Sequence, residues 1–159
     1  MSESKFGADF AQITDEAEKQ RVVRYILEAL PEWFEVEEGR EGYIKDCVSQ
    51  LCFGAFHQGA LIGFLCLKET GRETVELAVM GVLKEYHRKG VGRGLFMLAK
   101  EAAKANGYSF MQVKTVKMGV YESYDMTNLF YLSLGFKEFE VIDTIWNTEN
   151  PCQIYVMAL

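Results

Sequence analysis

The sequence predicts an α/β domain built on a mixed, mostly antiparallel sheet of six to seven strands flanked by about four helices. Three apolar runs of strand length follow one another without an intervening helix, and a strand–helix–strand pattern comes next. Strands joined by short turns are antiparallel, whereas strands joined through a helix are parallel. The 159 residues contain no repeat, low-complexity tract or Pro/Gly-rich linker. We therefore expect residues 1–159 to form a single domain.

The first element that we expect is a helix over residues 15–30. Asp15 and Glu18 have the spacing of a capping box, and Thr14 is an alternative cap. Apolar side chains then recur at helical spacing until a proline interrupts the pattern. A shorter helix is expected over residues 43–50.

Three strands are expected next, over residues 51–56, 61–67 and 75–83, with the first two forming a hairpin. A glycine-rich turn at residues 90–94 leads into an amphipathic helix that ends at an Asn-Gly pair. This helix would connect the third strand to a parallel fourth strand.

The C-terminal part continues with that fourth strand, over residues 110–116. A loop at residues 118–123 precedes a short helix that Asp125 can cap and that ends at Gly135. The two last strands are expected over residues 136–145 and 153–157.

Charge and cysteine content narrow the function classes. Lys and Arg total 17 against 23 Asp and Glu, a net charge of -6. A nucleic-acid partner is not expected, because duplex binding needs a basic face. The four cysteines form no CxxC pair and only two histidines accompany them, so we expect reduced core thiols, no metal and a cytoplasmic location. No apolar run has the length of a signal peptide or membrane span, so no membrane partner is expected.

The most informative segment is the glycine-spaced turn before the second long helix. Gly90, Gly92 and Gly94 allow backbone N–H groups to converge, and the helix N-terminus adds partial positive charge. Three cations flank the turn and can pair with anionic oxygens, namely Arg88, Lys89 and Arg93. The turn therefore predicts a phosphate or pyrophosphate site. It lacks the Gly-Lys-Ser/Thr of a P-loop and the third glycine of a dinucleotide fingerprint.

This turn resembles the acyl-CoA-binding motif of the GNAT family, Gln/Arg-x-x-Gly-x-Gly/Ala, with His87 at the first position and Gly90 and Gly92 at the glycines. A longer form of the motif has valine, proline and arginine upstream, where this chain has Val82, Lys84 and His87. The resemblance implies that the pyrophosphate of acetyl-CoA binds mainly to backbone N–H groups of this segment. The implied residues are His87, Arg88, Lys89, Gly90, Val91, Gly92 and Arg93.

A second segment resembles the GNAT Phe-Tyr-x-x-x-Gly-Phe signature, about forty residues after the turn. Its tyrosine is Tyr131, and the resemblance implies that this phenol is the general acid toward the departing thiolate. Asn128 precedes it by one helical turn on the same face. We expect Asn128 to reach the cofactor or to orient the phenol.

Acetyl transfer to an amine sets three chemical tasks. The amine, with a pKa of about 10, must lose a proton, the oxyanion needs a donor, and the thiolate needs a proton or hydrogen bond. No serine or cysteine nucleophile with a matching histidine stands out, so we expect direct attack in a ternary complex. Glu76, an acid among apolar residues, is the leading general base. The alternatives are Glu122, Asp125 and the hydroxyl of Tyr124.

The resemblance further implies that the third strand diverges from its parallel neighbour and that the pantetheine arm lies in the gap. The backbone N–H of Met80 would bind the oxyanion, the backbone of Met80 and Val82 would bind the arm, and Gly81 would permit close approach. We also expect three acceptor-binding residues near this gap, namely Tyr121, Glu122 and Tyr124.

The function expected from these motifs is an acetyl-CoA-dependent N-acetyltransferase acting on a primary amine. The acceptor would be a small molecule or a peptide, and the protein a monomer or homodimer. The alternative is a catalytically silent acyl-CoA-binding or sensing module. Tyr131 argues against this alternative, because a binder needs no acid beside the thiol.

Overall fold

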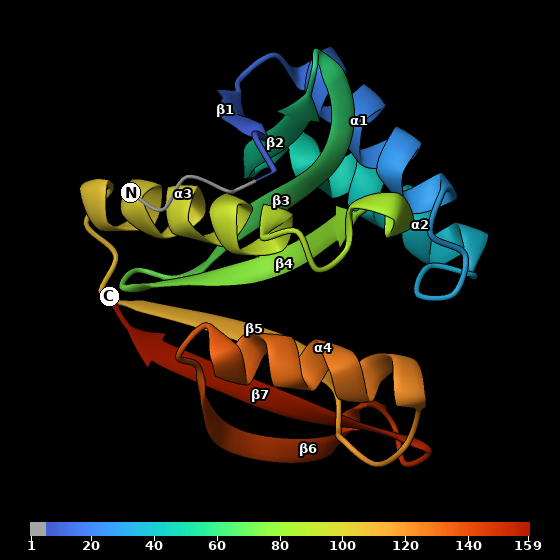
Figure 1. Cartoon of the computed structure of the whole chain (residues 1–159). Helices are drawn as coiled ribbons and strands as arrows, with labels where there is room; N and C mark the ends of the chain where they lie inside the picture. The colour runs from blue at the N-terminus through green and yellow to red at the C-terminus, as the bar shows by residue number, and fades with distance from the viewer. Residues whose placement is uncertain (1–5) are drawn as a thin grey trace.

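The computed structural model describes residues 6–159 and contains a seven-stranded sheet with helices on both faces (Figure 1). The strand order is β1-β2-β3-β4-β5-β7-β6. Every neighbouring pair is antiparallel except β4 and β5. The predicted α/β class and the mostly antiparallel sheet are thus confirmed.

The first four strands form an antiparallel meander. They are β1 (Asp9–Ile13), β2 (Leu51–His57), β3 (Ala60–Gly71) and β4 (Thr74–Val82). The sequence analysis assigned no strand to residues 9–13. β1 is a short edge strand in which only Ile13 is buried, so it has no alternation of apolar and polar residues to reveal it.

A β-bulge interrupts the pairing of β4 with β3. Cys66 pairs with Val79 and Leu67 pairs with Leu77, so Ala78 is the extra residue. The bulge changes which face the side chains occupy. Leu77 therefore belongs to the core under α3 (Val91–Ala105), whereas Val79 belongs to the core under α1 (Glu16–Glu28).

The helices divide between the two faces. α1 and α2 (Glu37–Asp46) cover one face, and α3 and α4 (Glu122–Ser133) pack on the other (Figure 1). Asp15 caps α1 as predicted, accepting from the N–H of Glu18 at 2.9 Å. The helix predicted over residues 43–50 is instead α2 followed by a 3₁₀ turn, and its mostly polar sequence buries only Ile44.

The last three strands are β5 (Phe110–Val116), β6 (Lys137–Asn147) and β7 (Asn150–Ala158). α4 begins before the predicted position, with Tyr121 rather than Asp125 at its N-cap. The Asp125 carboxylate accepts from the N–H of Gly119 at 2.7 Å. Asp125 therefore closes the preceding loop instead of capping the helix.

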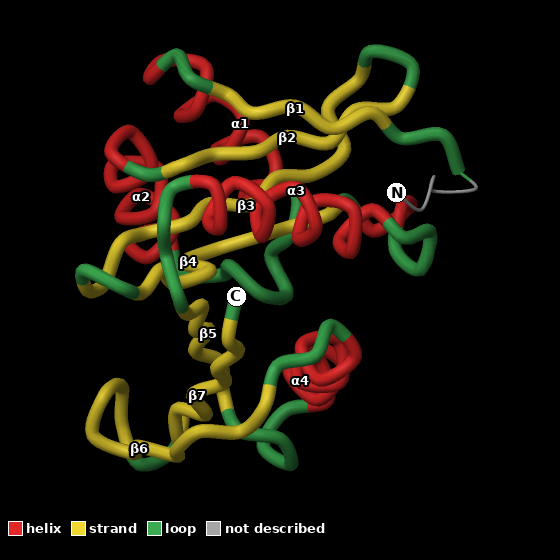
Figure 2. The backbone as a smooth tube through the Cα atoms, turned by 90° about the vertical axis from the view of Figure 1, so that its left-hand side faces the viewer, coloured by secondary structure: helices red, strands yellow, loops and turns green. Residues whose placement is uncertain are grey.

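β4 and β5 separate soon after they meet. They pair at three positions only, ending with Glu76 opposite Gln112. Beyond this point β4 continues beside β3 and β5 continues beside β7, so the two strands run apart (Figure 2). The gap that the family resemblance implies is therefore present in the sheet.

Across the described residues, no helix has the length and apolar character needed to cross a membrane. Nor do residues 6–159 hold a group of three or more His, Cys, Asp or Glu side chains arranged for a metal ion. All four cysteines are buried and unbridged.

Candidate active site

The first turn of α3 leaves backbone donors without a partner inside the helix. Gly90 is the N-cap and has a φ of 80°, a left-handed conformation that glycine adopts without strain. Within the described chain no side chain caps this helix. The first bond closing the turn runs from the N–H of Gly94 to the carbonyl of Gly90, at 3.0 Å. The N–H groups of residues 91–93 are therefore available to an anion at the positive end of the helix dipole.

The three cations around this turn lie in different environments. Arg88 is exposed on a left-handed backbone with a φ of 61°, and the ammonium of Lys89 lies 5.2 Å from the centre of the Phe6 ring. The guanidinium of Arg93 donates to the carbonyl and hydroxyl of Ser133, at 3.3 and 3.4 Å. Arg93 therefore connects α3 to α4, and its pairing with a bound anion stays a prediction.

His87 closes the turn back onto β4. Its Nε2 lies 2.6 Å from the carbonyl oxygen of Val82. A carbonyl can only accept, so Nε2 carries a hydrogen and donates it. The ring also contacts Trp33 edge-on, with 5.8 Å between the ring centres. The side chain of His87 thus positions the backbone of the turn, and it occupies a carbonyl that we expected to bind the pantetheine arm.

The backbone of β4 presents donors to the gap. The N–H of Leu83 donates to the carbonyl of Ile62 on β3 at 2.9 Å. Backbone groups alternate in direction along a strand, so the N–H groups of Met80 and Val82 point away from β3. Beyond Glu76, β5 no longer pairs with β4. The Met80 N–H therefore has the orientation that an oxyanion donor requires.

Two glycines of the predicted site also serve packing within the protein. A Cβ added to Gly81 would lie 2.9 Å from side-chain atoms of both Ile26 and Leu30. Gly81 therefore lets α1 approach the sheet, and its place beside the pantetheine arm stays a prediction. A Cβ on Gly92 would lie 3.0 Å from the Phe130 ring, so Gly92 lets α4 pack against the first turn of α3.

Tyr131 lies on α4 with its ring in the core and only 6% of its surface exposed. The ring contacts Phe136 and Tyr155, with centres 5.9 and 6.3 Å apart. Burial raises the pKa of the phenol above its ordinary value, and the nearby phenols of Tyr43 and Tyr124 raise it further. The group therefore stays protonated, as a general acid must.

Electrostatic influence on the Tyr131 phenol comes from more than one element. Tyr43 lies on α2, on the opposite face of the sheet from α4, and Tyr124 lies on α4 itself. Both phenols add to the effect of burial on the pKa of Tyr131.

Asn128 is fully buried and all its polar atoms bind protein groups. Its Nδ2 donates to the carbonyls of Val116 and Tyr124, at 2.9 and 2.7 Å. Its Oδ1 accepts from the hydroxyl of Tyr155 at 2.6 Å. Asn128 thus joins α4 to β5 and β7, and the expectation that it reaches the cofactor or orients Tyr131 stays a prediction.

Glu76 lies at the last paired position of β4 and forms an ion pair with Lys114 of β5. Lys114 Nζ and Glu76 Oε1 are 2.6 Å apart, and the side chains are 29% and 15% exposed. The charge of Glu76 also helps to raise the pKa of Tyr43, after burial and the neighbouring phenol of Tyr124. Glu76 therefore contributes negative charge to the surroundings of Tyr43.

Aromatic residues of α2, of α4 and of the segment between α1 and α2 contact residues of one another's segments. The hydroxyl of Tyr124 donates to the carbonyl of Trp33 at 3.4 Å. The Tyr121 ring lies 6.1 Å from that of Tyr124, and Phe34 meets Tyr43 edge-on at 6.0 Å. Glu122 is exposed on the first turn of α4. The structure thus brings the predicted Tyr121 and Tyr124 together, whereas no hydrogen bond or ion pair within residues 6–159 ties the Glu122 carboxylate to either ring.

The sequence analysis missed three residues of this region, namely Trp33, Tyr43 and Lys114. None belongs to a motif. A possible signal was that Trp33 and Tyr43 are large aromatic residues in an otherwise acidic segment. Only the fold shows that they lie near Tyr124 and Glu76.

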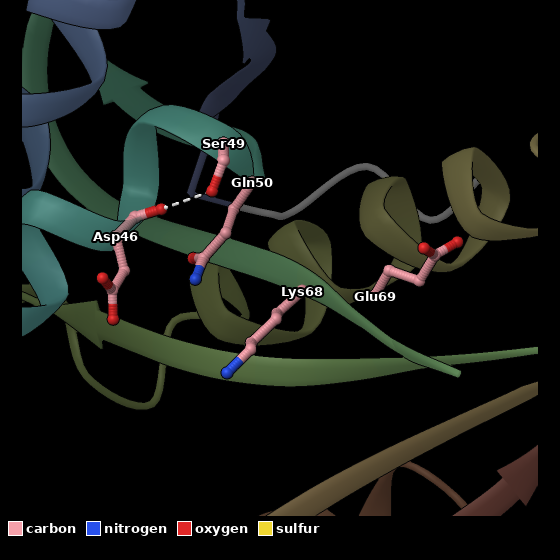
Figure 3. A pocket seen from close by; sticks show the side chains of 5 residues that line it. All are labelled: Asp46, Ser49, Gln50, Lys68 and Glu69. Atoms are coloured by element: carbon pink, nitrogen blue, oxygen red, sulfur yellow. Dashed lines mark hydrogen bonds between the residues drawn. The ribbon is translucent and has the colours of Figure 1, made fainter. Parts of the chain in front are cut away.

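A hollow of about 310 Å³ opens on the same face of the sheet (Figure 3). Its lining residues are Asp46, Ser49, Gln50, Lys68 and Glu69. Lys68 is directly opposite Glu76 in the β3–β4 register. The hollow is therefore a polar space beside the candidate base.

The family model described as acetyltransferase (GNAT) family matches residues 19–136. None of the curated protein sequences matches the chain. The matched range includes the glycine turn, Glu76 and the aromatic signature on α4.

Solved structures of low sequence identity share the fold. IAA acetyltransferase from Bacillus cereus has a TM-score of 0.71 and 22% identity, covering 96% of this chain and 99% of its own. An aminoglycoside 6'-N-acetyltransferase complexed with coenzyme A has a TM-score of 0.73 and 13% identity, covering 93% and 96%. A GNAT family acetyltransferase from Elizabethkingia anophelis with acetyl-CoA bound has a TM-score of 0.69 and 17% identity, covering 96% and 98%.

Proposed function

Because the chain belongs to the acetyltransferase (GNAT) family, we propose that it moves an acetyl group from acetyl-CoA to a primary amine by direct attack in a ternary complex. The observation that carries this proposal is the position of Tyr131. Burial raises the pKa of its phenol and so keeps it protonated, and it occupies the tyrosine position of the aromatic signature on α4. On the neighbouring strand β4, backbone N–H groups face the gap beside β5.

The residues present fit acetyl-CoA. The N–H groups of residues 91–93 would hold the pyrophosphate, and the exposed Arg88 can pair with its oxygens. The gap beyond Glu76 would take the pantetheine arm, with the N–H of Met80 directed at the thioester oxygen. In this proposal the phosphate site, the oxyanion donor and Tyr131 act on successive parts of one bound acetyl-CoA.

The proposed reaction divides its proton transfers between the two sides of the gap. Glu76 removes a proton from the acceptor ammonium, directly or through water, and the neutral amine attacks the thioester carbon. The Met80 N–H donates to the oxyanion that forms. When the C–S bond breaks, the Tyr131 hydroxyl gives a proton to the leaving sulfur. The product nitrogen then loses its extra proton to water, and Tyr131 regains a proton from water. Lys114 holds the Glu76 carboxylate at the end of the strand pairing.

A cationic acceptor fits the charge on the α2 side. Residues 28–46 carry seven carboxylates and two cations. This segment contains Tyr43 and Trp33, and aromatic faces attract ammonium groups. The negative charge would raise the local concentration of a protonated amine.

Thiol release from acetyl-CoA across polyamines, aminoglycosides, amino acids and peptide N-termini tests the proposal. We expect turnover with at least one amine and none with the matching alcohol. Calorimetry with CoA should show binding in the same protein. Binding without turnover of any amine would instead indicate the silent binding module, and absence of binding would contradict both functions.

A further inference from the structure

Two buried thiols face each other outside the residues assigned to acetyl transfer. Cys52 on β2 and Cys66 on β3 are directly opposed in an antiparallel register, and neither has exposed surface. Ile13 on β1 and Val79 on β4 continue the same row beneath α1. The sheet therefore holds the two sulfur atoms on one face, side by side.

The two thiols have opposite tendencies to ionise. Hydrogen bonding from the Cys66 thiol lowers the pKa of Cys52 against the effect of burial, and the ammonium of Lys19 lowers it further. The same contact and burial raise the pKa of Cys66 well above its ordinary value. Cys52 is thus the better nucleophile, and Cys66 is the thiol that can resolve an oxidised partner.

Lys19 also brings a polar group close to Cys52. Its Nζ donates to the carbonyls of Gln50 and Val48, at 2.7 and 3.2 Å. The Lys19 side chain is only partly buried, so it runs from the surface toward the backbone close to Cys52. A small, uncharged oxidant can reach the two buried thiols when α1 opens locally.

The spacing of opposed residues suits a disulfide. Directly opposed residues on antiparallel strands have Cα atoms about 4.5–5.5 Å apart, within the range of about 4.4–6.8 Å for disulfides. Their Cβ atoms, at about 4.5–5.5 Å, must come slightly closer for the bond to form.

We propose that Cys52 and Cys66 form a reversible disulfide when the folded protein meets hydrogen peroxide. The Cys52 thiolate attacks one peroxide oxygen, giving a sulfenic acid and releasing hydroxide. The Cys66 sulfur then attacks the Cys52 sulfur, forming the S–S bond, while hydroxide leaves and takes up a proton as water. In sum two thiols and one hydrogen peroxide give one disulfide and two waters.

The other two cysteines provide matched controls. The Cys47 thiol lies in the same core but donates to the carbonyl of Ile44 at 3.1 Å, and burial is the main cause that raises its pKa to about 11. Burial likewise raises the pKa of Cys152 on β7. Neither has another cysteine opposite it in the sheet register.

The experiment exposes the reduced, full-length protein to hydrogen peroxide under native conditions, alkylates the remaining thiols after denaturation, and maps the peptides by mass spectrometry. We expect a loss of two hydrogens and a cross-linked peptide pair that joins Cys52 to Cys66. Treatment with dithiothreitol should restore four alkylatable thiols. Cys47→Ser and Cys152→Ser should still form the bond, whereas Cys52→Ser and Cys66→Ser should not.

A second sample oxidised in urea separates native geometry from chance pairing. The unfolded chain should give mixed pairings among all four cysteines, since the sheet no longer aligns them. The proposal is overturned if native oxidation joins other cysteines, or if Cys52 and Cys66 stay alkylatable throughout. The parent protein alone gives this answer, so it stands even if a serine variant fails to fold.

Discussion

The carboxylate of Glu76 on β4 and the ammonium of Lys114 on β5 lie 2.6 Å apart where the two strands stop pairing. The pair joins both edges of the gap on the face that α2 covers. It fixes the direction of the candidate base, and it supplies a cation that can balance the carboxylate charge when no acceptor is bound. This relationship leads to the first prediction.

Glu76→Gln should reduce kcat at neutral pH by about 10²- to 10⁴-fold, the usual contribution of a general base. The loss should shrink as pH approaches about 10, because the acceptor amine then loses its proton without help. A pH series of thiol-release rates, with each variant's fold checked by circular dichroism, measures this recovery.

Glu101→Gln is the matched control, since Glu101 is an exposed carboxylate on α3 whose nearest cation, Lys104, is 4.0 Å away. It should keep the parental rate at every pH. If Glu76→Gln keeps the parental rate at neutral pH, another residue is the general base, and Glu122 is the next residue to test.

Tyr131→Phe should lower kcat by about 10²- to 10⁴-fold, because the leaving thiolate loses its donor. CoA affinity should change little, since the ring keeps its contacts with Phe136 and Tyr155. Steady-state kinetics and calorimetry on the folded variant measure the two effects.

Tyr155→Phe is the control for a buried phenol without a proposed chemical role. It removes the hydroxyl that donates to Asn128 Oδ1 at 2.6 Å, so it should lower stability by about 1–3 kcal/mol and leave kcat close to the parent. A kcat within about twofold of the parent for Tyr131→Phe would exclude the general-acid assignment.

Alkaline pH should destabilise the fold in part through Tyr131. Its pKa in the folded protein is above the ordinary value of 10.0, so folding favours the protonated phenol. This contribution is complete below pH 10 and is lost as pH rises toward the folded value, because only the unfolded chain then releases the proton. Each such proton changes the free energy of unfolding by about 1.4 kcal/mol per pH unit.

Urea unfolding between about pH 9 and pH 11.5 checks this sign. Tyr131→Phe lacks the titrating group, so its free energy of unfolding should fall less steeply than that of the parent above pH 10. Equal slopes would mean that the phenol is not shielded from water in the folded state.

Gly92→Val should weaken CoA binding at least tenfold. The new Cβ would lie 3.0 Å from the Phe130 ring, and its methyl groups would shift the first turn of α3, where the free N–H groups converge.

Gly94→Ala is the control, because its Cβ would meet the Phe10 ring at 2.2 Å. It should lower stability by about 1–3 kcal/mol while the folded fraction still binds CoA. Unchanged calorimetric affinity in a folded Gly92→Val variant would count against the pyrophosphate site.

Features set by neighbouring residues could be predicted most fully. The capping of α1 by Asp15, the glycine turn before α3 and the strand-length apolar runs each depend on a few consecutive residues. β1 and the start of α2 could not be located, because few of their side chains are buried and their sequences lack a clear period.

Side-chain partners were harder to predict than elements. Arg93, Gly81 and Asn128 each lie in a segment that the sequence analysis placed at the site. Their contacts within the protein are with Ser133, with α1, and with Tyr155. A motif indicates where a residue lies along the chain, whereas its partner is chosen by whichever element packs against it.

The sequence by itself determined the fold class, the order of most elements, the glycine turn and the position of Tyr131 on a helix, because these depend on local backbone preferences and on hydrophobic periodicity. Only the tertiary structure decided that β4 and β5 separate after Glu76, and that Lys114 meets Glu76 there. Those relationships depend on strand register and on a bulge at Ala78. Both are set by the packing of segments that are far apart in the chain.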